Sequence, residues 1–163
     1  MDSALRFFHY TSPTYLPAII KAGYIKFATA GIDKKEKPAV WLSTNPVWEH
    51  TATKIGMING IPTQMTMEQQ YKLVGLARIE VQRLDDFVSW KKFRHVSGVT
   101  EQSFLFMERL GKVKGAKPEE WWAYFKPIEK DLWLRIEIWN GTEWVSADNI
   151  VEGIKNLFDV NSN

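Results

Sequence analysis

The order of the predicted elements indicates an α+β protein with a split, strongly curved mixed β-sheet and flanking helices. Predicted strands and helices do not alternate along the chain, which argues against a doubly wound parallel sheet. Several of the 8 tryptophans fall in strand-like segments, as expected for a β-rich core or a cleft that stacks planar ligands. A length of 163 residues with 45% hydrophobic residues predicts a single domain over residues 1–163.

Local sequence signals divide the chain into short elements. Aromatic and β-branched runs between turn residues predict strands, and apolar residues near helical spacing predict helices. Residues 30–38 predict an exposed loop, residues 47–70 a long irregular segment or lid, and Asn140-Gly141 a type I′ turn. In chain order we predict a strand at 5–11, a helix capped by Ser12 and ended by Gly23, strands at 24–28, 39–43 and 71–81, helices at 84–96 and 100–113, a strand at 121–128, a hairpin at 133–147 and a helix at 149–159.

Composition argues against several classes of protein. A net charge of +2 is too small to indicate a nucleic-acid partner, and the absence of cysteine excludes disulfides and thiolate chemistry. His9, His50 and His95 have no metal-binding spacing, so we expect no metal. Rossmann, P-loop and nucleophile-elbow glycine motifs are absent. The first residues lack a signal-peptide pattern and no apolar stretch is long enough to span a bilayer, so we expect a cytoplasmic protein with no membrane partner.

His9 is the first candidate for chemistry. It lies late in a predicted strand, directly before a helix N-terminus whose free backbone N–H groups could bind a polar or anionic group. An ordinary hydrogen-bonded strand histidine near a turn explains the same position, and spacing alone favours that interpretation. Tyr10 alternates with His9 and should therefore face the opposite side of the sheet.

Three segments resemble the DarT-like group of small bacterial and phage ADP-ribosyltransferases. FFHYTSPTYLPAIIKAGYIK at 7–26 is similar to the opening of that group, and VWLSTNP at 40–46 is similar to its apolar strand that ends in Ser or Thr. PEEWWAYFKPIEKDLW at 118–133 resembles the arrangement in which a Glu leads into a late strand. Residues 50–115 have no firm match. The residues that match in the first segment are Phe8, His9, Thr11, Leu16, Ile20 and Gly23.

The resemblance implies an ADP-ribosyltransferase-like fold that uses NAD as a substrate. By this similarity, the residues around His9 hold the adenosine half of NAD and the strand at 40–46 helps to build the nicotinamide pocket. The catalytic carboxylate is Glu120, with Glu119 next and Glu137 a weaker candidate in a hairpin strand. The implied cofactor-binding residues are His9, Tyr10, Thr11, Trp41, Ser43 and Thr44.

The function that follows is transfer of ADP-ribose from NAD to a macromolecule, with DNA, RNA and protein all open as acceptors. The alternatives are NAD hydrolysis by a glycohydrolase and a catalytically inactive binding module on the same fold. By analogy with the group, small size favours a toxin, a defence component or a counter-defence factor, with an antitoxin or immunity partner. Lys91, Lys92 and Arg94 form either a basic surface for an acidic target or an ordinary solvated helix face.

Overall fold

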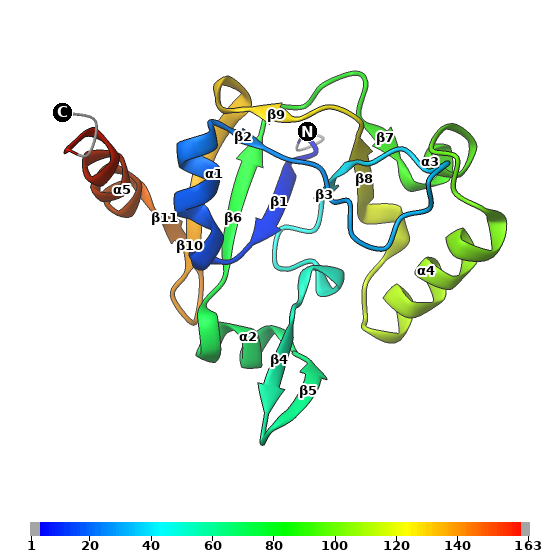
Figure 1. The fold of residues 1–163 in the computed structure, drawn as a ribbon, viewed down its shortest axis with the longest axis horizontal. Helices are drawn as coiled ribbons and strands as arrows, with labels where there is room; N and C mark the ends of the chain where they lie inside the picture. The colour runs from blue at the N-terminus through cyan, green and yellow to red at the C-terminus, as the bar shows by residue number, and fades with distance from the viewer. Residues whose placement is uncertain (1–3, 161–163) are drawn as a thin grey trace.

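The computed structural model describes residues 4–160 and is built on one seven-stranded sheet with strand order β11-β10-β6-β1-β3-β8-β7 (Figure 1). Every strand pairing in this sheet is antiparallel, so the α+β class is confirmed but the expected mixture of parallel and antiparallel pairs is wrong. The strands are β1 (Phe7–Thr11), β3 (Val40–Ser43), β6 (Ala77–Val81), β7 (Val88–Ser89), β8 (Trp121–Tyr124), β10 (Trp133–Trp139) and β11 (Trp144–Ser146).

β1 runs through the middle of the sheet and has side chains in two separate cores. Phe7 belongs to an apolar cluster with Leu42 and Ile79, whereas Phe8 and Tyr10 belong to a second cluster with Trp48. This is the alternation expected of a strand that is covered on both faces. The predicted separation of Tyr10 from His9 is therefore confirmed.

The face of the sheet that bears Phe7 is covered by the helix after β1. The 3-10 turn η1 (Pro13–Tyr15) leads into α1 (Leu16–Ala22), and Gly23 ends the helix in the left-handed conformation with a φ of 76°, as predicted. Ser12 was expected to cap this helix, but its side chain makes no capping hydrogen bond. The C-terminal helix α5 (Asp148–Val160) packs on α1 and β10.

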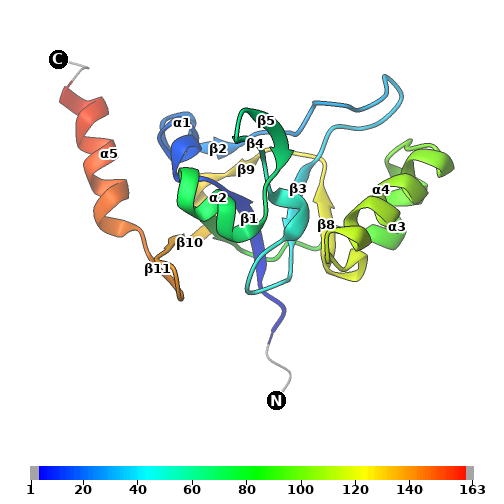
Figure 2. The same ribbon diagram turned by 90° about the horizontal axis from the view of Figure 1, so that it is seen from below.

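The other face is covered at its β8 end by α3 (Trp90–Val96) and α4 (Glu101–Val113) (Figure 2). Trp90 anchors this layer, because its ring stacks on Phe104 at a centroid distance of 4.3 Å and meets Trp121 edge-on at 4.9 Å. The predicted helix at 84–96 is too long at its N-terminal end, because Val88 and Ser89 pair with β8 as β7. The 3-10 turn η3 (Pro118–Glu120) leads from this layer into β8.

The prediction of an irregular segment at 47–70 is wrong. This region forms the 3-10 turn η2 (His50–Ala52), the hairpin of β4 (Ile55–Ile58) and β5 (Ile61–Gln64), and the start of α2 (Met67–Val74). The hairpin turns at Asn59-Gly60, whose φ angles of 51° and 77° suit a type I′ turn. Thr66 and Gln69 form a capping box at the start of α2.

Two further expectations need correction. Residues 71–81 are not one strand, because α2 runs to Val74 and β6 starts only at Ala77, after Gly75 with its φ of 80°. The type I′ turn at Asn140-Gly141 is also wrong, because Trp139 pairs with Trp144 across a longer loop. The side-chain oxygen of Asn140 accepts the backbone N–H groups of Thr142 and Glu143 and holds that loop.

A small second sheet joins the helical layer of α1 to the segment after β8. β2 (Tyr24–Ile25) pairs with β9 (Ile128–Glu129), which the 3-10 turn η4 (Lys130–Leu132) connects to β10. The predicted strand at 24–28 is thus reduced to two residues and an isolated bridge between Ala28 and Ala39. The predicted strand at 121–128 is likewise divided into β8 and β9.

Candidate functional site

The three segments that carried the resemblance lie on adjacent strands, because β3 is between β1 and β8. β1 and β3 are joined by a single register pair, Phe8 with Ser43, whereas β1 makes five such pairs with β6. Next to that pair, the two strands are linked by a side chain, because Nδ1 of His9 lies 3.0 Å from the carbonyl oxygen of Trp41. The two strands are therefore joined by one register pair and by the side chain of His9, and we call this junction the seam.

The contact with Trp41 fixes the chemical state of His9. A carbonyl oxygen can only accept, so Nδ1 must carry the proton and donate it, which leaves Nε2 as a free acceptor in the neutral ring. Burial lowers the pKa of His9 below its ordinary value of 6.5, and the nearby charge of Lys54 lowers it further, against the opposing effect of the bond to Trp41. The half-buried His9 thus offers one hydrogen-bond acceptor, which suits a hydroxyl group of a ligand.

Glu120 is the last residue of η3 and directly precedes β8, where the end of β3 meets it. The backbone N–H of Thr44 donates to the Glu120 carbonyl oxygen over 3.0 Å, which extends the pairing of the two strands by one residue. Asn45 Nδ2 donates to Glu120 Oε2 over 2.9 Å. The Glu120 side chain is half-buried, and Oε1 has no hydrogen-bond partner within residues 4–160. One carboxylate oxygen is therefore fixed and the other is available.

Asn45 is itself held on every side. Its Oδ1 accepts the backbone N–H groups of Val47 at 2.9 Å and Trp48 at 3.3 Å, and its own backbone N–H donates to Ser43 Oγ at 3.1 Å. These bonds orient the side-chain amide and leave Nδ2 directed at Glu120. Asn45 was not predicted as a site residue, although a polar side chain directly after a strand end and before a proline was a visible signal.

Three side chains from other strands hold the loop that carries Asn45, and we call them the carbonyl clamp. Each donates to one of three consecutive backbone carbonyls: Tyr10 Oη to Asn45, Arg78 Nη1 to Pro46 at 2.6 Å, and Trp144 Nε1 to Val47 at 2.8 Å. Burial raises the pKa of Tyr10 to about 12, so its hydroxyl stays protonated and continues to donate. β1, β6 and β11 thereby fix the loop beside Glu120.

The structure separates the candidate carboxylates. Glu119 is exposed. Glu137 is buried and forms an ion pair with Arg78 at 2.6 Å, which makes it part of the support for the carbonyl clamp. Glu49 was not predicted and is also buried, but its oxygens accept from Ser43 Oγ, Trp121 Nε1 and both the N–H and the hydroxyl of Thr51. Oε1 of Glu137 also has no hydrogen-bond partner within residues 4–160, but Glu137 is buried and its charge is paired with Arg78. Of these four carboxylates, Glu120 is the one that combines a fixed oxygen with an unpartnered oxygen on a half-buried side chain without an ion pair in the described residues.

The remaining predicted binding residues are mostly buried. Tyr10 lies 5.0 Å from Trp48 between ring centroids and is 6% exposed, so it supports the site from the opposite face and offers no surface to a ligand. Thr11 is buried as well, and Ser43 is committed to Glu49. Trp41 is half-buried against Phe93, and Thr44 contacts Glu120 through its backbone.

No family model, curated protein or solved structure matches the chain. Within residues 4–160 no helix combines the length and the apolar character needed to cross a membrane. The same residues contain no group of three or more His, Cys, Asp and Glu side chains placed to hold a metal ion.

Proposed function

We propose that the chain is an NAD-dependent ADP-ribosyltransferase in which Glu120 is the catalytic carboxylate and His9 binds the dinucleotide. The observation that carries this proposal is the state of Glu120, whose Oε2 is fixed by Asn45 while Oε1 is open. On the other side of β3, His9 presents a free Nε2 acceptor in the single-pair seam. This seam is our candidate for the split in the sheet of an ADP-ribosyltransferase-like fold.

The chemistry needs a negative group beside a sugar carbon. As the bond between nicotinamide and C1′ of the ribose breaks, its electron pair leaves with nicotinamide and positive charge develops on the sugar. A preorganised carboxylate at the position of Glu120 stabilises that charge. The lone pair of the acceptor nucleophile then bonds to C1′, and its proton passes to Glu120 Oε1 and on to solvent. His9 Nε2 would accept a hydrogen bond from a hydroxyl of the adenosine ribose.

The first prediction concerns the two adjacent glutamates. Glu120→Gln keeps the size of the side chain and removes its charge, and should reduce nicotinamide release from NAD by at least about a hundredfold. Glu119→Gln is the matched control, because the exposed Glu119 should be dispensable. Release is measured with purified protein, alone and with DNA, RNA or protein fractions.

The same assay separates the alternatives. Stimulation by one fraction, with ADP-ribose attached to it, identifies the acceptor class. Release without any labelled macromolecule would indicate NAD hydrolysis. An absence of release in every condition, together with an absence of NAD binding, would contradict the enzyme proposal and leave a binding module.

A further inference from the structure

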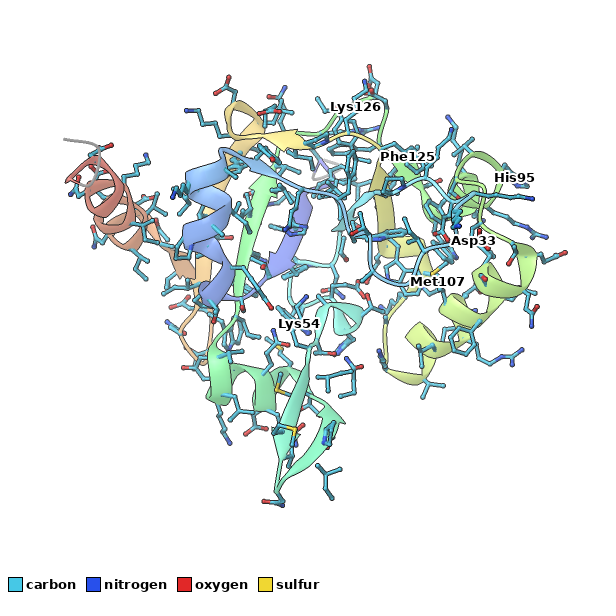
Figure 3. All side chains as sticks on the ribbon, in the orientation of Figure 1. Asp33, Lys54, His95, Met107, Phe125 and Lys126 are labelled. Atoms are coloured by element: carbon cyan, nitrogen blue, oxygen red, sulfur yellow. The ribbon has the colours of Figure 1, made fainter. Side chains whose placement is uncertain are left out.

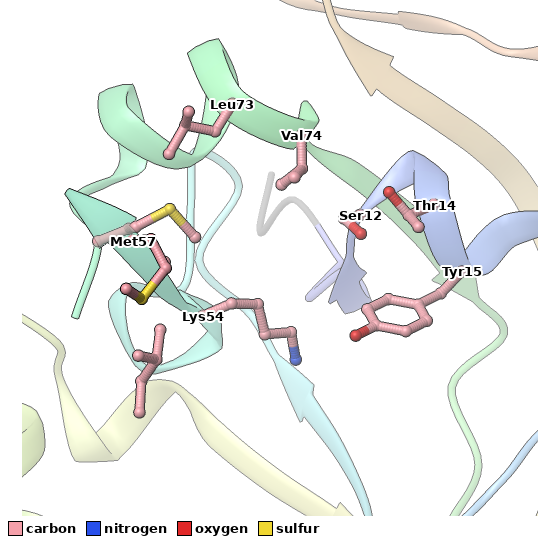
Figure 4. A pocket seen from close by; sticks show the side chains of 10 residues that line it. Ser12, Thr14, Tyr15, Lys54, Met57, Leu73 and Val74 are labelled. Carbon is pink, nitrogen blue, oxygen red and sulfur yellow. The ribbon is translucent and has the colours of Figure 1, made fainter. Parts of the chain in front are cut away.

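A cavity of about 400 Å³ lies between the end of β1 and the β4–β5 hairpin. Its volume falls in the range of small-molecule sites, roughly 300–1,000 Å³. Lys54 lies between the sheet and the hairpin (Figure 3), and its side chain extends across the cavity toward Ser12 and Tyr15 (Figure 4). The other lining residues are Thr14, Ile55, Gly56, Met57, Met65, Leu73 and Val74.

Lys54 is an exposed residue that places a positive charge beside this cavity. Its ammonium forms no ion pair with any carboxylate in residues 4–160, and Nζ lies 5.9 Å from the centroid of the Tyr15 ring. Its backbone is well fixed, because its N–H donates to Gln70 Oε1 at 2.7 Å and its carbonyl accepts from Met65 N–H at 3.0 Å. The stem of the side chain therefore starts from a defined place, and the charge is free to meet an anion.

Ser12 places a hydroxyl group on the opposite wall. The residue is only 2% exposed, and its side chain makes no capping hydrogen bond. Because Ser12 lines the cavity and points into it (Figure 4), the hydroxyl can bond a polar ligand atom.

The rest of the wall is apolar and open. Ile55, Met57 and Leu73 are 70%, 62% and 54% exposed, and the ring of Tyr15 is 52% exposed. Such a surface suits a planar, weakly polar group, and thioether and aromatic side chains both make favourable contacts with rings. A ligand with a planar ring at one end and negative charge at the other matches both halves of the cavity.

We propose that this cavity binds the adenosine diphosphate portion of NAD, with Lys54 and Ser12 on the diphosphate and the apolar wall on the adenine. The inference rests on the proposed function, since it takes the ligand to be the same dinucleotide. The cavity begins directly after β1, since Ser12 follows the last residue of that strand, and the charge of Lys54 contributes to lowering the pKa of His9.

The test is calorimetric titration of ADP and of adenosine into wild type, Lys54→Met and Lys91→Met. Losing one charge-assisted contact costs about 1.5–3 kcal/mol, so the Kd for ADP should rise about tenfold or more in Lys54→Met. Adenosine carries no phosphate, and its Kd should change less than twofold. Lys91→Met removes the same charge from an exposed position on α3 and should bind both ligands like wild type.

Three results would overturn the inference: no binding of ADP by wild type at millimolar concentration, equal affinity of Lys54→Met and Lys91→Met for ADP, or an equal loss for adenosine. These outcomes are independent of the nicotinamide assay. If nicotinamide release depends on Glu120 but the Kd for ADP is the same in Lys54→Met and wild type, the transferase proposal stands and the proposal for the cavity fails. If ADP binding depends on Lys54 but NAD is never cleaved, the cavity stands as a nucleotide site and the transferase proposal fails.

Discussion

The geometry of the Glu120 carboxylate depends on one neighbour, Asn45. The amide of Asn45 is oriented by the turn bonds that its Oδ1 makes and donates to Glu120 from a fixed position. A carboxylate that must stabilise a developing positive charge works best when its geometry is set in advance. The arrangement around Glu120 provides this before any ligand arrives.

Asn45→Asp tests this dependence. Aspartate keeps the oxygen that accepts from Val47 and Trp48 but replaces the donor by a second negative group facing Glu120. Loss of a hydrogen bond to a charged group is worth about 1.5–3 kcal/mol, so kcat for nicotinamide release should fall about tenfold or more. Urea unfolding serves as the control for folding. A kcat within twofold of wild type would show that Asn45 does not position Glu120.

His9 predicts a pH dependence of stability. Its pKa in the folded protein is below 6.5 because of burial, so the unfolded chain binds the proton more readily. The stabilisation is complete above pH 6.5 and is lost as the pH falls below it. Urea unfolding between pH 5 and 8 should show a steeper acid loss in wild type than in His9→Gln. His95→Gln, at an exposed position, should follow wild type; identical profiles for wild type and His9→Gln would contradict the prediction.

Among the elements, α4 approaches β8 through a glycine. A Cβ added at Gly111 would lie 2.3 Å from Cη2 of Trp121, whereas one added at Gly153 in α5 would meet no atom within 4 Å. Trp121 follows Glu120 directly and donates to the buried Glu49. Close packing of α4 thus supports the strand end that carries the site.

The same substitution should have opposite effects in these two helices. Gly111→Ala overpacks the contact with Trp121 and should lower the free energy of unfolding by about 1–3 kcal/mol. Gly153→Ala should leave it unchanged or raise it by up to about 1 kcal/mol, since alanine is the better helix former. Thermal unfolding measures both. Equal effects of the two changes would contradict the packing of α4 on Trp121.

How well the elements could be predicted is clearest at the two Asn-Gly pairs. Asn140-Gly141 predicted a type I′ turn, but the φ angles of that turn occur at Asn59-Gly60. Asn140 instead uses its side chain to hold a longer loop. Nearby, Thr66 and Gln69 carried a capping-box signal for α2, yet the β-favouring residues before β6 led to the prediction of a strand.

At the scale of the whole molecule, local sequence patterns could not predict which strands pair with the central strand β1. β6 pairs with β1 across more than 60 residues and carries Arg78, which reaches both Glu137 and the loop at Pro46. Local patterns predicted β1, β3 and β8, but not that Asn45, Glu49 and Lys54 would gather around them. Those residues come together through long-range pairing, which periodicity does not encode.

Glu120 and Glu137, the two other candidate catalytic carboxylates, should contribute to different properties of the protein. Glu137 holds Arg78 and through it the carbonyl clamp, so its loss should act on stability. Breaking a buried ion pair costs about 3–5 kcal/mol. Glu120 has an open oxygen and no ion pair within residues 4–160, so its loss should act on chemistry.

The most direct test is therefore nicotinamide release by Glu120→Gln and Glu137→Gln, measured at a temperature at which unfolding curves show both proteins to be folded. The account predicts that Glu120→Gln is as stable as wild type and inactive, while Glu137→Gln is less stable and retains NAD cleavage. Activity in Glu120→Gln comparable to wild type, or no NAD cleavage by wild type with any acceptor, would contradict it.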